Sequence, residues 1–212
     1  MKYRRLGCDG PLVSAIGMRR GTQPVQSGEP LEQEFNAAIG RALELGVNLF
    51  DSSDAYWGAR HEVLLGRALK GRRDAAQIIT KFGNIDLPLG RGLLTGRIKT
   101  VDDLPLGDRR RKHPRFKPDN LARNVELVEQ LEAIAGARGV SSAQLALAWL
   151  LAQGDDIVPI PGTNHVPNLE QNAAAVDIVL STDELRRLDQ VFAPGAGAGE
   201  RYMASALAGM GL

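Results

Sequence analysis

The sequence is poor in cysteine, in net charge and in long apolar runs, and each shortage excludes a class of protein. Cys8 is the only cysteine among 212 residues, so the chain cannot form an internal disulfide, and we expect a reducing, cytoplasmic location. A formal net charge of +1 provides no overall field that favours nucleic acid or a membrane surface. The longest apolar run, 143–152, is far shorter than the roughly 20 residues of a membrane span. The start, MKYRRLG, lacks the apolar core of a signal peptide.

The remaining composition is that of an ordinary globular protein, with 43% hydrophobic and 24% charged residues. Its length suits one domain over residues 1–212, made of an N-terminal part (1–85) and a C-terminal part (86–212). A basic run at 109–113 has no aromatic platform beside it, so a solvated loop is favoured over a nucleic-acid surface.

The N-terminal part alternates strand and helix patterns. A hairpin is predicted from β-prone runs at 2–6 and 11–17 around the turn Cys8-Asp9-Gly10. Helical spacing of apolar residues follows at 31–45 and 61–70, and short apolar strands at 47–50 and 76–81. This order predicts right-handed crossovers and a parallel sheet.

The C-terminal part is mostly helical. Residues 82–118 show no clear strand or long helix, which is an unusual length for a loop in a compact domain. Helices are predicted at 119–137, with Asp119 or Asn120 as N-cap, from Ser141 or Ser142 to about Gln153, at 167–175 and at 182–192. A short buried strand is predicted at 157–160.

Three side chains are expected to meet at one end of the sheet. The strand at 47–50 turns polar at Asp51 and is followed by Tyr56, and the strand at 76–81 ends in Lys81. Polar residues at the carboxyl ends of parallel strands are how a β/α barrel builds an active site. The sequence therefore predicts a site made by Asp51, Tyr56 and Lys81.

Several motifs in order resemble the aldo-keto reductase family of NAD(P)H-dependent carbonyl reductases. They are FDSSDAY, EVLLGRALKGRRD, IITKFG, PLGRGLLTG, SSAQLALAWLLAQ, IVPIPGT and GERY, and they cover most of the chain. The resemblance implies an α/β fold of the TIM-barrel kind, and it implies that Asp51, Tyr56 and Lys81 match three of the family's four catalytic positions. It also implies contacts to the cofactor pyrophosphate from Pro88, Leu89, Gly90 and Gly92. Contacts to the adenosine end are implied for Gly162, Thr163, Asn164, Gln171 and Asn172, and no metal site is implied.

The chain departs from the family pattern in three places. The catalytic histidine and barrel strands four to seven belong between TKFG and PLGRG, where only Asn84 to Leu87 stand here. We therefore expect an incomplete barrel of about four parallel strands, in which strands one, two, three and eight are neighbours. Gly17-Met18-Arg19-Arg20 replaces a small, glycine-rich strand end. Asn164-His165 stands where members that prefer NADP place a lysine or arginine.

The chemistry implied is reduction of small aldehydes or ketones with NADP(H), with NAD(H) as the alternative cofactor. Tyr56 would protonate the carbonyl oxygen. Because a phenol has a pKa near 10, Lys81 would be needed to stabilise the phenolate, and Asp51 would hold Lys81. His61 could replace the missing histidine only with a rearranged backbone, and the simpler interpretation is a surface residue at a helix start.

Alternative outcomes remain open at this point. One is a catalytically impaired remnant that binds nucleotides or mediates oligomerisation, and another is a poorly folded product. Two open edges of a four-stranded half-barrel would allow a homodimer that completes the barrel. In the competing monomer, residues 82–118 fold over the open face. We expect neither nucleic acid nor a membrane as a partner.

Overall fold

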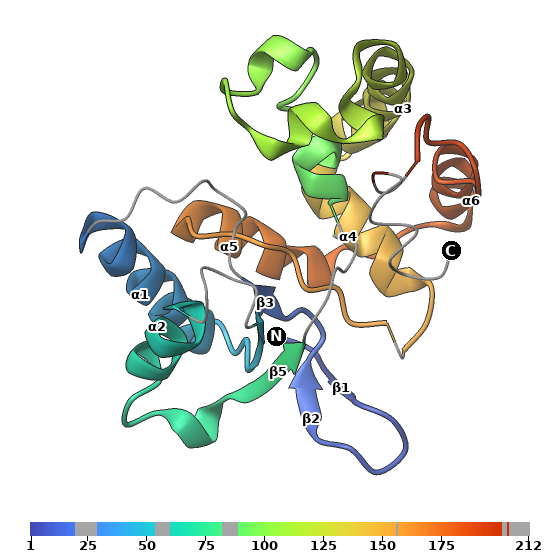
Figure 1. Cartoon of the computed structure of the whole chain (residues 1–212). Coiled ribbons are helices and arrows are strands. Elements are labelled where there is room, and N and C mark those ends of the chain that lie inside the picture. Colours follow the sequence, from blue (N-terminus) through green and yellow to red (C-terminus); the bar gives the residue numbers. More distant parts are fainter. Residues whose placement is uncertain (20–28, 54–59, 82–88, 156, 201–202, 204–212) are drawn as a thin grey trace. The chain divides into compact units, whose positions relative to one another are not determined.

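The structure is a computed structural model that describes residues 1–19, 29–53, 60–81, 89–155, 157–200 and 203. The chain divides into two compact units, and each is described by itself (Figure 1). The first unit comprises Met1–Pro88 and Leu147–Val179, and the second comprises Leu89–Ala146 and Leu180–Leu212. Each unit is thus built from two separate stretches of the chain. The expectation of one domain over 1–212 stays a prediction.

The first unit begins with the expected hairpin. Strands β1 (Tyr3–Arg5) and β2 (Leu12–Ser14) are antiparallel, with Tyr3 opposite Ser14. Arg4 of β1 fixes the hairpin to a distant part of the unit, because its guanidinium donates hydrogen bonds to three main-chain oxygens. These acceptors are Leu151, Gly154 and Ile157. Arg4 therefore provides hydrogen-bond donors for carbonyl groups at and after the end of the helix Ser142–Ala152.

The centre of the first unit is a parallel sheet. Its order is β3 (Met18–Arg19), β4 (Leu49–Ser53) and β5 (Gln77–Lys81), with both neighbouring pairs parallel. An extended segment after Ile157 runs along the other edge of β3, where Arg19 and Gly162 form a parallel bridge. The backbone N–H of Gly17 donates to the Pro159 oxygen at 3.1 Å, and that of Thr163 to the Arg19 oxygen at 3.0 Å. Residues 18–19, 49–53 and 77–81 therefore share one parallel sheet, and the segment after Ile157 adjoins its β3 edge through these bonds.

Two of these strands differ from the prediction. Residues 157–160 form no regular strand, because Pro159 and Pro161 have no N–H to donate to a ladder. The stretch near 14–18 divides into the end of β2 and the two-residue β3. At Gly17 the chain passes so close to β4 that an added Cβ would lie 3.1 Å from the Leu49 oxygen.

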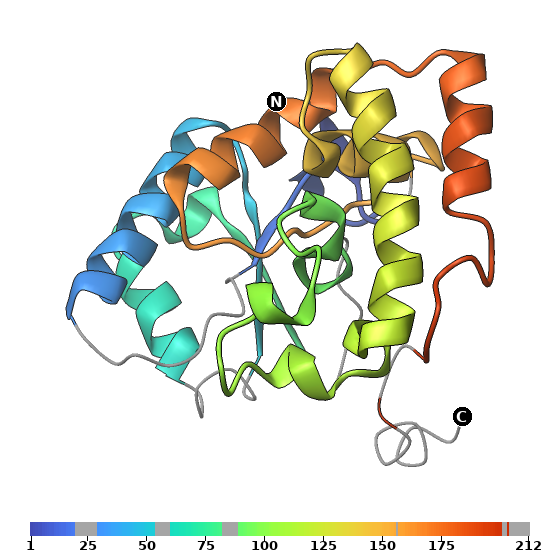
Figure 2. The ribbon, with the colours of Figure 1, turned by 90° about the horizontal axis from the view of Figure 1, so that it is seen from above.

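Helices cover one face of this sheet. They are α1 (Glu29–Glu44), α2 (Arg60–Ala68) and α5 (Val166–Ala174), and Figure 2 shows them on one side of the strands. Their apolar residues pack against the outward-facing residues of β3 and β4 in a buried cluster. Its members include Met18, Phe35, Ile39, Phe50, Leu64, Leu65, Leu69 and Leu169. Short 3-10 turns, η1 (Arg73–Ala75) and η6 (Ala175–Asp177), follow α2 and α5.

The second unit is helical. It contains α3 (Pro118–Ala137), α6 (Thr182–Val191) beside it, and the first residues of α4 (Ser142–Ala152) (Figure 2). The described part of the expected loop forms four 3-10 turns: η2 (Gly90–Thr95), η3 (Val101–Asp103), η4 (Arg109–Lys112) and η5 (Pro114–Phe116). These turns pack on α3 through Leu93, Ile98, Leu104, Phe116, Leu121 and Val128.

Two helix starts test the cap predictions. Helix α3 begins one residue earlier than expected, with Lys117 as N-cap and Pro118 in the first turn, so Asp119 and Asn120 are not the cap. Proline suits this position because its missing N–H would have no intrahelical partner. Helix α6 begins as predicted, since the Ser181 side chain accepts from the Glu184 N–H in a capping box.

Asn124 of α3 ties the C-terminal stretch to the second unit. Its side chain is buried, and its amide nitrogen donates to the main-chain oxygens of Arg115 and Ala198. Its amide oxygen accepts from the Ala198 N–H at 2.7 Å. One buried amide thus holds the PRF turn and the chain near residue 198 together.

Among the described residues, no single helix has both the length and the apolarity of a membrane span, and α3 and α4 pass only jointly, as a bent pair, on length and composition alone.

Candidate functional site

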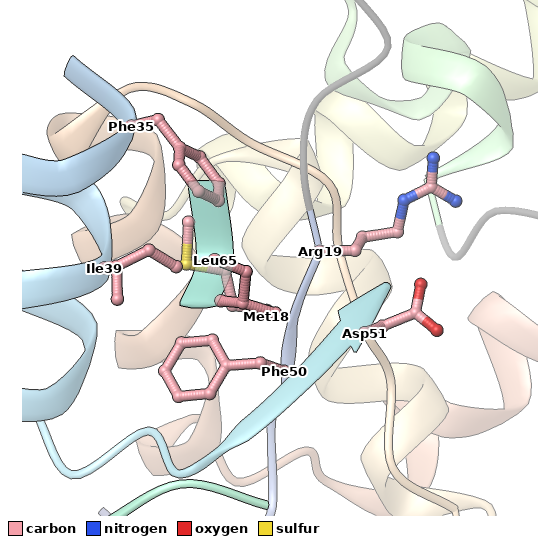
Figure 3. A pocket seen from close by; sticks show the side chains of 7 residues that line it. All are labelled: Met18, Arg19, Phe35, Ile39, Phe50, Asp51 and Leu65. Atoms are coloured by element: carbon pink, nitrogen blue, oxygen red, sulfur yellow. The ribbon is translucent and has the colours of Figure 1, made fainter. Parts of the chain in front are cut away.

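The carboxyl edge of the parallel sheet carries two buried charged residues. Asp51 of β4 is 5% exposed and Arg19 of β3 is 7% exposed. The two are paired across the strands in register. Their side chains point to the same side of the sheet, away from Met18 and Phe50, which point to the helices (Figure 3). Strand alternation explains this, because residues 18 and 50 precede residues 19 and 51 by one position.

The register also relates Asp51 to the predicted lysine position. Asp51 lies opposite Ile79 of β5, and Ser53 lies opposite Lys81. Residues 51 and 81 therefore stand on neighbouring parallel strands at the same edge, as the sequence predicts. The Lys81 side chain and Tyr56 lie outside the described part of the structure, so the contact between the three side chains stays a prediction.

A small hollow adjoins this edge. It is lined by Met18, Arg19, Phe35, Ile39, Phe50, Asp51 and Leu65 (Figure 3). Its empty volume is about 160 Å³, open solvent included. Ligand pockets usually measure about 300–1,000 Å³. The hollow is therefore a gap beside the apolar cluster and is too small to hold a substrate.

The predicted adenosine-end residues follow the extended segment that pairs with β3. Thr163 and Asn164 are buried, while Gly162 is exposed. The Thr163 hydroxyl accepts from the His165 N–H at 3.1 Å, and α5 starts at the next residue. On α5, Gln171 is exposed and Asn172 is buried. A helix N-terminus directly after a strand offers N–H groups and a favourable dipole to an anionic ligand.

The predicted pyrophosphate residues lie in the second unit, except Pro88, which is outside the described residues. From Leu89 the chain enters three consecutive left-handed residues: Gly90 (φ 56°), Arg91 (φ 58°) and Gly92 (φ 90°). Within this turn, the N–H groups of Gly92 and Leu94 both donate to the Leu89 oxygen, at 2.9 and 3.3 Å. Glycine is needed at the last position, where an added Cβ would be strained and would lie 3.3 Å from Arg110 Nη1.

Arg110 holds this glycine turn in place. Its Nη1 donates to the Arg91 oxygen at 3.0 Å, and its Nη2 donates to Asp108 Oδ2 at 2.7 Å. This guanidinium holds the pKa of the Asp108 carboxyl below its ordinary value. The predicted pyrophosphate residues from Leu89 on and the predicted adenosine residues thus belong to different units, and their contact with a cofactor stays a prediction.

Two histidines have described side chains, and neither lines the hollow beside Asp51. His165 contacts Glu34 of α1 through Nδ1. His113 belongs to the second unit, and burial, with smaller effects of Arg91 and Arg109, lowers its pKa below the ordinary value. The side chain of His61 is outside the described part. In the same part of the chain, no three acidic, histidine or cysteine side chains stand close enough to hold a metal ion.

Two residues of this region are not identifiable as site residues from the sequence. Arg19 departs from the family pattern, and it lies beside Asp51 in the strand register. Glu34 belongs to the amphipathic helical pattern of 31–45. Periodicity assigns it to a polar face, and no local signal identifies His165 as its partner.

Comparisons with known proteins agree on one family. The model of the aldo/keto reductase family matches residues 17–87 and 85–193. Aldo-keto reductase yakc (NADP(+)) of Schizosaccharomyces pombe is 49% identical over 115 residues, which is 54% of this chain and 34% of that protein. Probable aldo-keto reductase 1 of Glycine max is 43% identical over 115 residues, or 54% of this chain and 33% of that protein. These matches span only about a third of each relative.

Solved structures support the same fold. The glycerol dehydrogenase of Gluconobacter oxydans superposes with a TM-score of 0.74 at 17% identity, over 91% of this chain and 95% of that chain. An aldo-keto reductase of Klebsiella pneumoniae in complex with NADPH gives a TM-score of 0.62 at 18% identity, over 91% and 95% of the two chains. The predicted α/β fold with parallel strands is confirmed, and its sheet does not close into a barrel within the described residues.

Proposed function

The chain belongs to the aldo/keto reductase family, and on that premise we propose that it reduces small aldehydes or ketones to alcohols with NADPH. The observation that carries the proposal is the buried carboxylate of Asp51 at the carboxyl edge of a parallel sheet. Enzymes of the β/α-barrel kind place their catalytic residues at this edge. A cytoplasmic location, expected from the single cysteine, is part of the same proposal.

The family resemblance assigns roles to this chain's residues. When bound, the nicotinamide cofactor would supply the hydride. Tyr56 would donate its phenolic proton to the carbonyl oxygen, Lys81 would stabilise the phenolate that remains, and Asp51 would orient Lys81. The cofactor would be held by two groups of residues. They are Pro88, Leu89, Gly90 and Gly92 at the pyrophosphate, and Gly162, Thr163, Asn164, Gln171 and Asn172 at the adenosine.

A second candidate function is a catalytically impaired nucleotide-binding or oligomerisation module. The observation that favours it is Arg19, whose side chain points to the same face of the sheet as Asp51 (Figure 3). A guanidinium on the neighbouring strand and on the same face as the carboxylate would compete with Lys81 for it. In this case NADPH would bind, but no substrate would be reduced.

The first test is NADPH binding, which fluorescence titration measures. We expect the wild-type protein to bind, and we expect Gln171→Ala to weaken binding about fivefold, the usual worth of one exposed hydrogen bond. Gln171 is the suitable position because it is exposed, whereas truncating the buried Asn172 would also disturb packing. The exposed Gln190 of α6 serves as the control, and Gln190→Ala should bind as the wild type does. A wild-type protein that does not bind NADPH would contradict the proposal.

We also propose that two copies complete the barrel. Each copy contributes four parallel segments, namely β3, β4, β5 and the extended segment bridged at Gly162. No strand among the described residues pairs with the outer edge of β5. Unpaired parallel edges accept strands from other chains. A two-fold axis along the barrel would pair β5 of each copy with the extended segment of the other, which gives the eight strands of a closed barrel.

Light scattering at several protein concentrations tests this assembly. We expect a species of twice 22.8 kDa at micromolar protein. A species of 22.8 kDa across the whole range would exclude the dimer and would favour the monomer whose residues 82–118 cover the open face. Aggregates without fixed stoichiometry would instead favour a poorly folded product.

A further inference from the structure

Arg19 places a positive charge in the middle of the carboxyl edge of the sheet. It is the last residue of β3, which lies between β4 and the extended segment bridged at Gly162. On one side Arg19 is paired in register with Asp51, and on the other side it forms the parallel bridge to Gly162. The Thr163 N–H donates to the Arg19 main-chain oxygen at 3.0 Å and supports this arrangement. Arg19 therefore stands between the strand of Asp51 and the loop assigned to the adenosine end.

The guanidinium of Arg19 is buried, and its chemistry allows it to serve more than one partner. Burial of a charge is costly unless hydrogen bonds compensate for it, and the Arg19 side chain points to the face of the sheet that carries Asp51 (Figure 3). A guanidinium has five N–H donors in a planar fork, so it can contact a carboxylate and still donate to a phosphate. In the sequence, Arg19 is the only charged residue of β3 and of the stretch 157–164. These two segments therefore offer an anion one cation, which is Arg19.

Resting on the proposed function, in which Asp51 lies at the reacting end of the cofactor and Gly162 at its adenosine end, we infer that Arg19 binds the cofactor pyrophosphate. Neighbouring strands are about 4.8 Å apart, so β4 and the bridged segment are separated by roughly 10 Å. A dinucleotide that reaches from one to the other crosses the end of β3. Its pyrophosphate joins the two nucleosides and is therefore the part that meets Arg19. Guanidinium groups bind phosphate oxygens through paired, charge-assisted hydrogen bonds.

Replacing Arg19 by glutamine tests this contact, and fluorescence titration measures the affinities. We expect Arg19→Gln to weaken the binding of NADPH and NADH by the same factor, about 10- to 100-fold, because both cofactors contain the pyrophosphate. Arg19→Lys keeps the charge but loses the planar fork, so its loss of affinity should be intermediate. Arg72 of the same unit provides the control, because it is exposed and donates to the Ala68 main-chain oxygen at 2.8 Å. Arg72→Gln should bind both cofactors as the wild type does.

A ligand without the pyrophosphate separates a lost contact from a disturbed fold. Adenosine 2′-monophosphate has the adenosine end of NADPH but no pyrophosphate, and calorimetric titration measures its binding. Arg19→Gln should bind this ligand as tightly as the wild type does. Circular dichroism shows whether each variant folds, and Arg19→Lys carries the comparison if Arg19→Gln does not.

The other outcomes contradict the inference in different ways. Unchanged affinity of the folded variants for both cofactors overturns it alone, and so does an equal loss of affinity for adenosine 2′-monophosphate, which indicates a disturbed fold. A loss for NADPH but not for NADH assigns Arg19 to the 2′-phosphate instead. A higher kcat with unchanged cofactor binding indicates that Arg19 competes with Lys81 for Asp51. Absence of NADPH and NADH binding in the wild-type protein overturns the inference together with the proposed function.

Discussion

Replacing Tyr56 by phenylalanine should lower kcat for reduction of an activated aldehyde by about 10²- to 10⁴-fold, the usual contribution of a general acid. The substitution removes one hydroxyl and leaves the ring, so cofactor binding should change by no more than about twofold. Steady-state oxidation of NADPH measures the first effect, and fluorescence titration measures the second. A loss confined to kcat is the signature of a group that acts in the transition state.

Tyr3 provides the matched control for this experiment. Its hydroxyl donates to the Gly46 main-chain oxygen at 3.1 Å in an exposed position of the hairpin, so Tyr3→Phe removes the same atom far from the proposed chemistry along the sequence. Tyr3→Phe should retain the wild-type kcat. Turnover that survives in Tyr56→Phe would eliminate Tyr56 as the acid, whereas an inactive wild-type protein that still binds NADPH would favour the nucleotide-binding module.

The second large effect concerns the stability of the first unit. Phe50→Ala should lower the free energy of unfolding by about 3–5 kcal/mol, the range measured for phenylalanine truncation in cores. Phe50 is 1% exposed and lies in β4, where it packs into the cluster formed with α1, α2 and α5 (Figure 3). Its removal leaves a cavity that neighbouring strands and helices cannot close without shifting. Urea unfolding followed by circular dichroism measures the change.

Leu106 gives the comparison for Phe50. It is a large apolar residue, but it is 92% exposed in the turn before η4. Leu106→Ala should change the free energy of unfolding by no more than about 0.5 kcal/mol. If the two alanine variants unfold at the same urea concentration, the cluster around Phe50 is not a core.

The fold is predictable from the sequence where a local pattern carries the information. Apolar spacing identifies α1 and α6, and the Ser181–Glu184 capping box marks the start of α6. The change from Phe50 to Asp51 predicts both the end of a buried strand and a polar edge. Parallel order then follows from alternating strands and helices, so the shared edge of residues 51 and 81 needs no tertiary information.

Features that depend on distant partners are not predictable in this way. Arg19 is buried although it is charged, and it lies between β4 and the segment bridged at Gly162, both of which are distant in the chain. Glu34 and His165 are 131 positions apart in the chain, and the sequence around neither residue predicts their contact. An apolar run predicts a strand at 157–160. Because Pro159 and Pro161 have no N–H to donate, the run forms only an extended segment with few ladder hydrogen bonds. The departures thus have two causes, namely contacts between residues distant in the chain and local proline chemistry that overrides an apolar pattern.

The first unit is made of two separate stretches of the chain, and this affects how it folds during synthesis. β3 finds its neighbour β4 some thirty residues later, but its other neighbour, the segment bridged at Gly162, is made more than 140 residues after Arg19. Until the ribosome has extruded that segment, one edge of β3 is open and the cluster around Met18 lacks Leu169. Closing so long a loop costs conformational entropy, which only the contacts formed late can offset. Until then the open edge of β3 can pair with other chains, so nascent chains that end before Gly162 should aggregate more readily than longer ones.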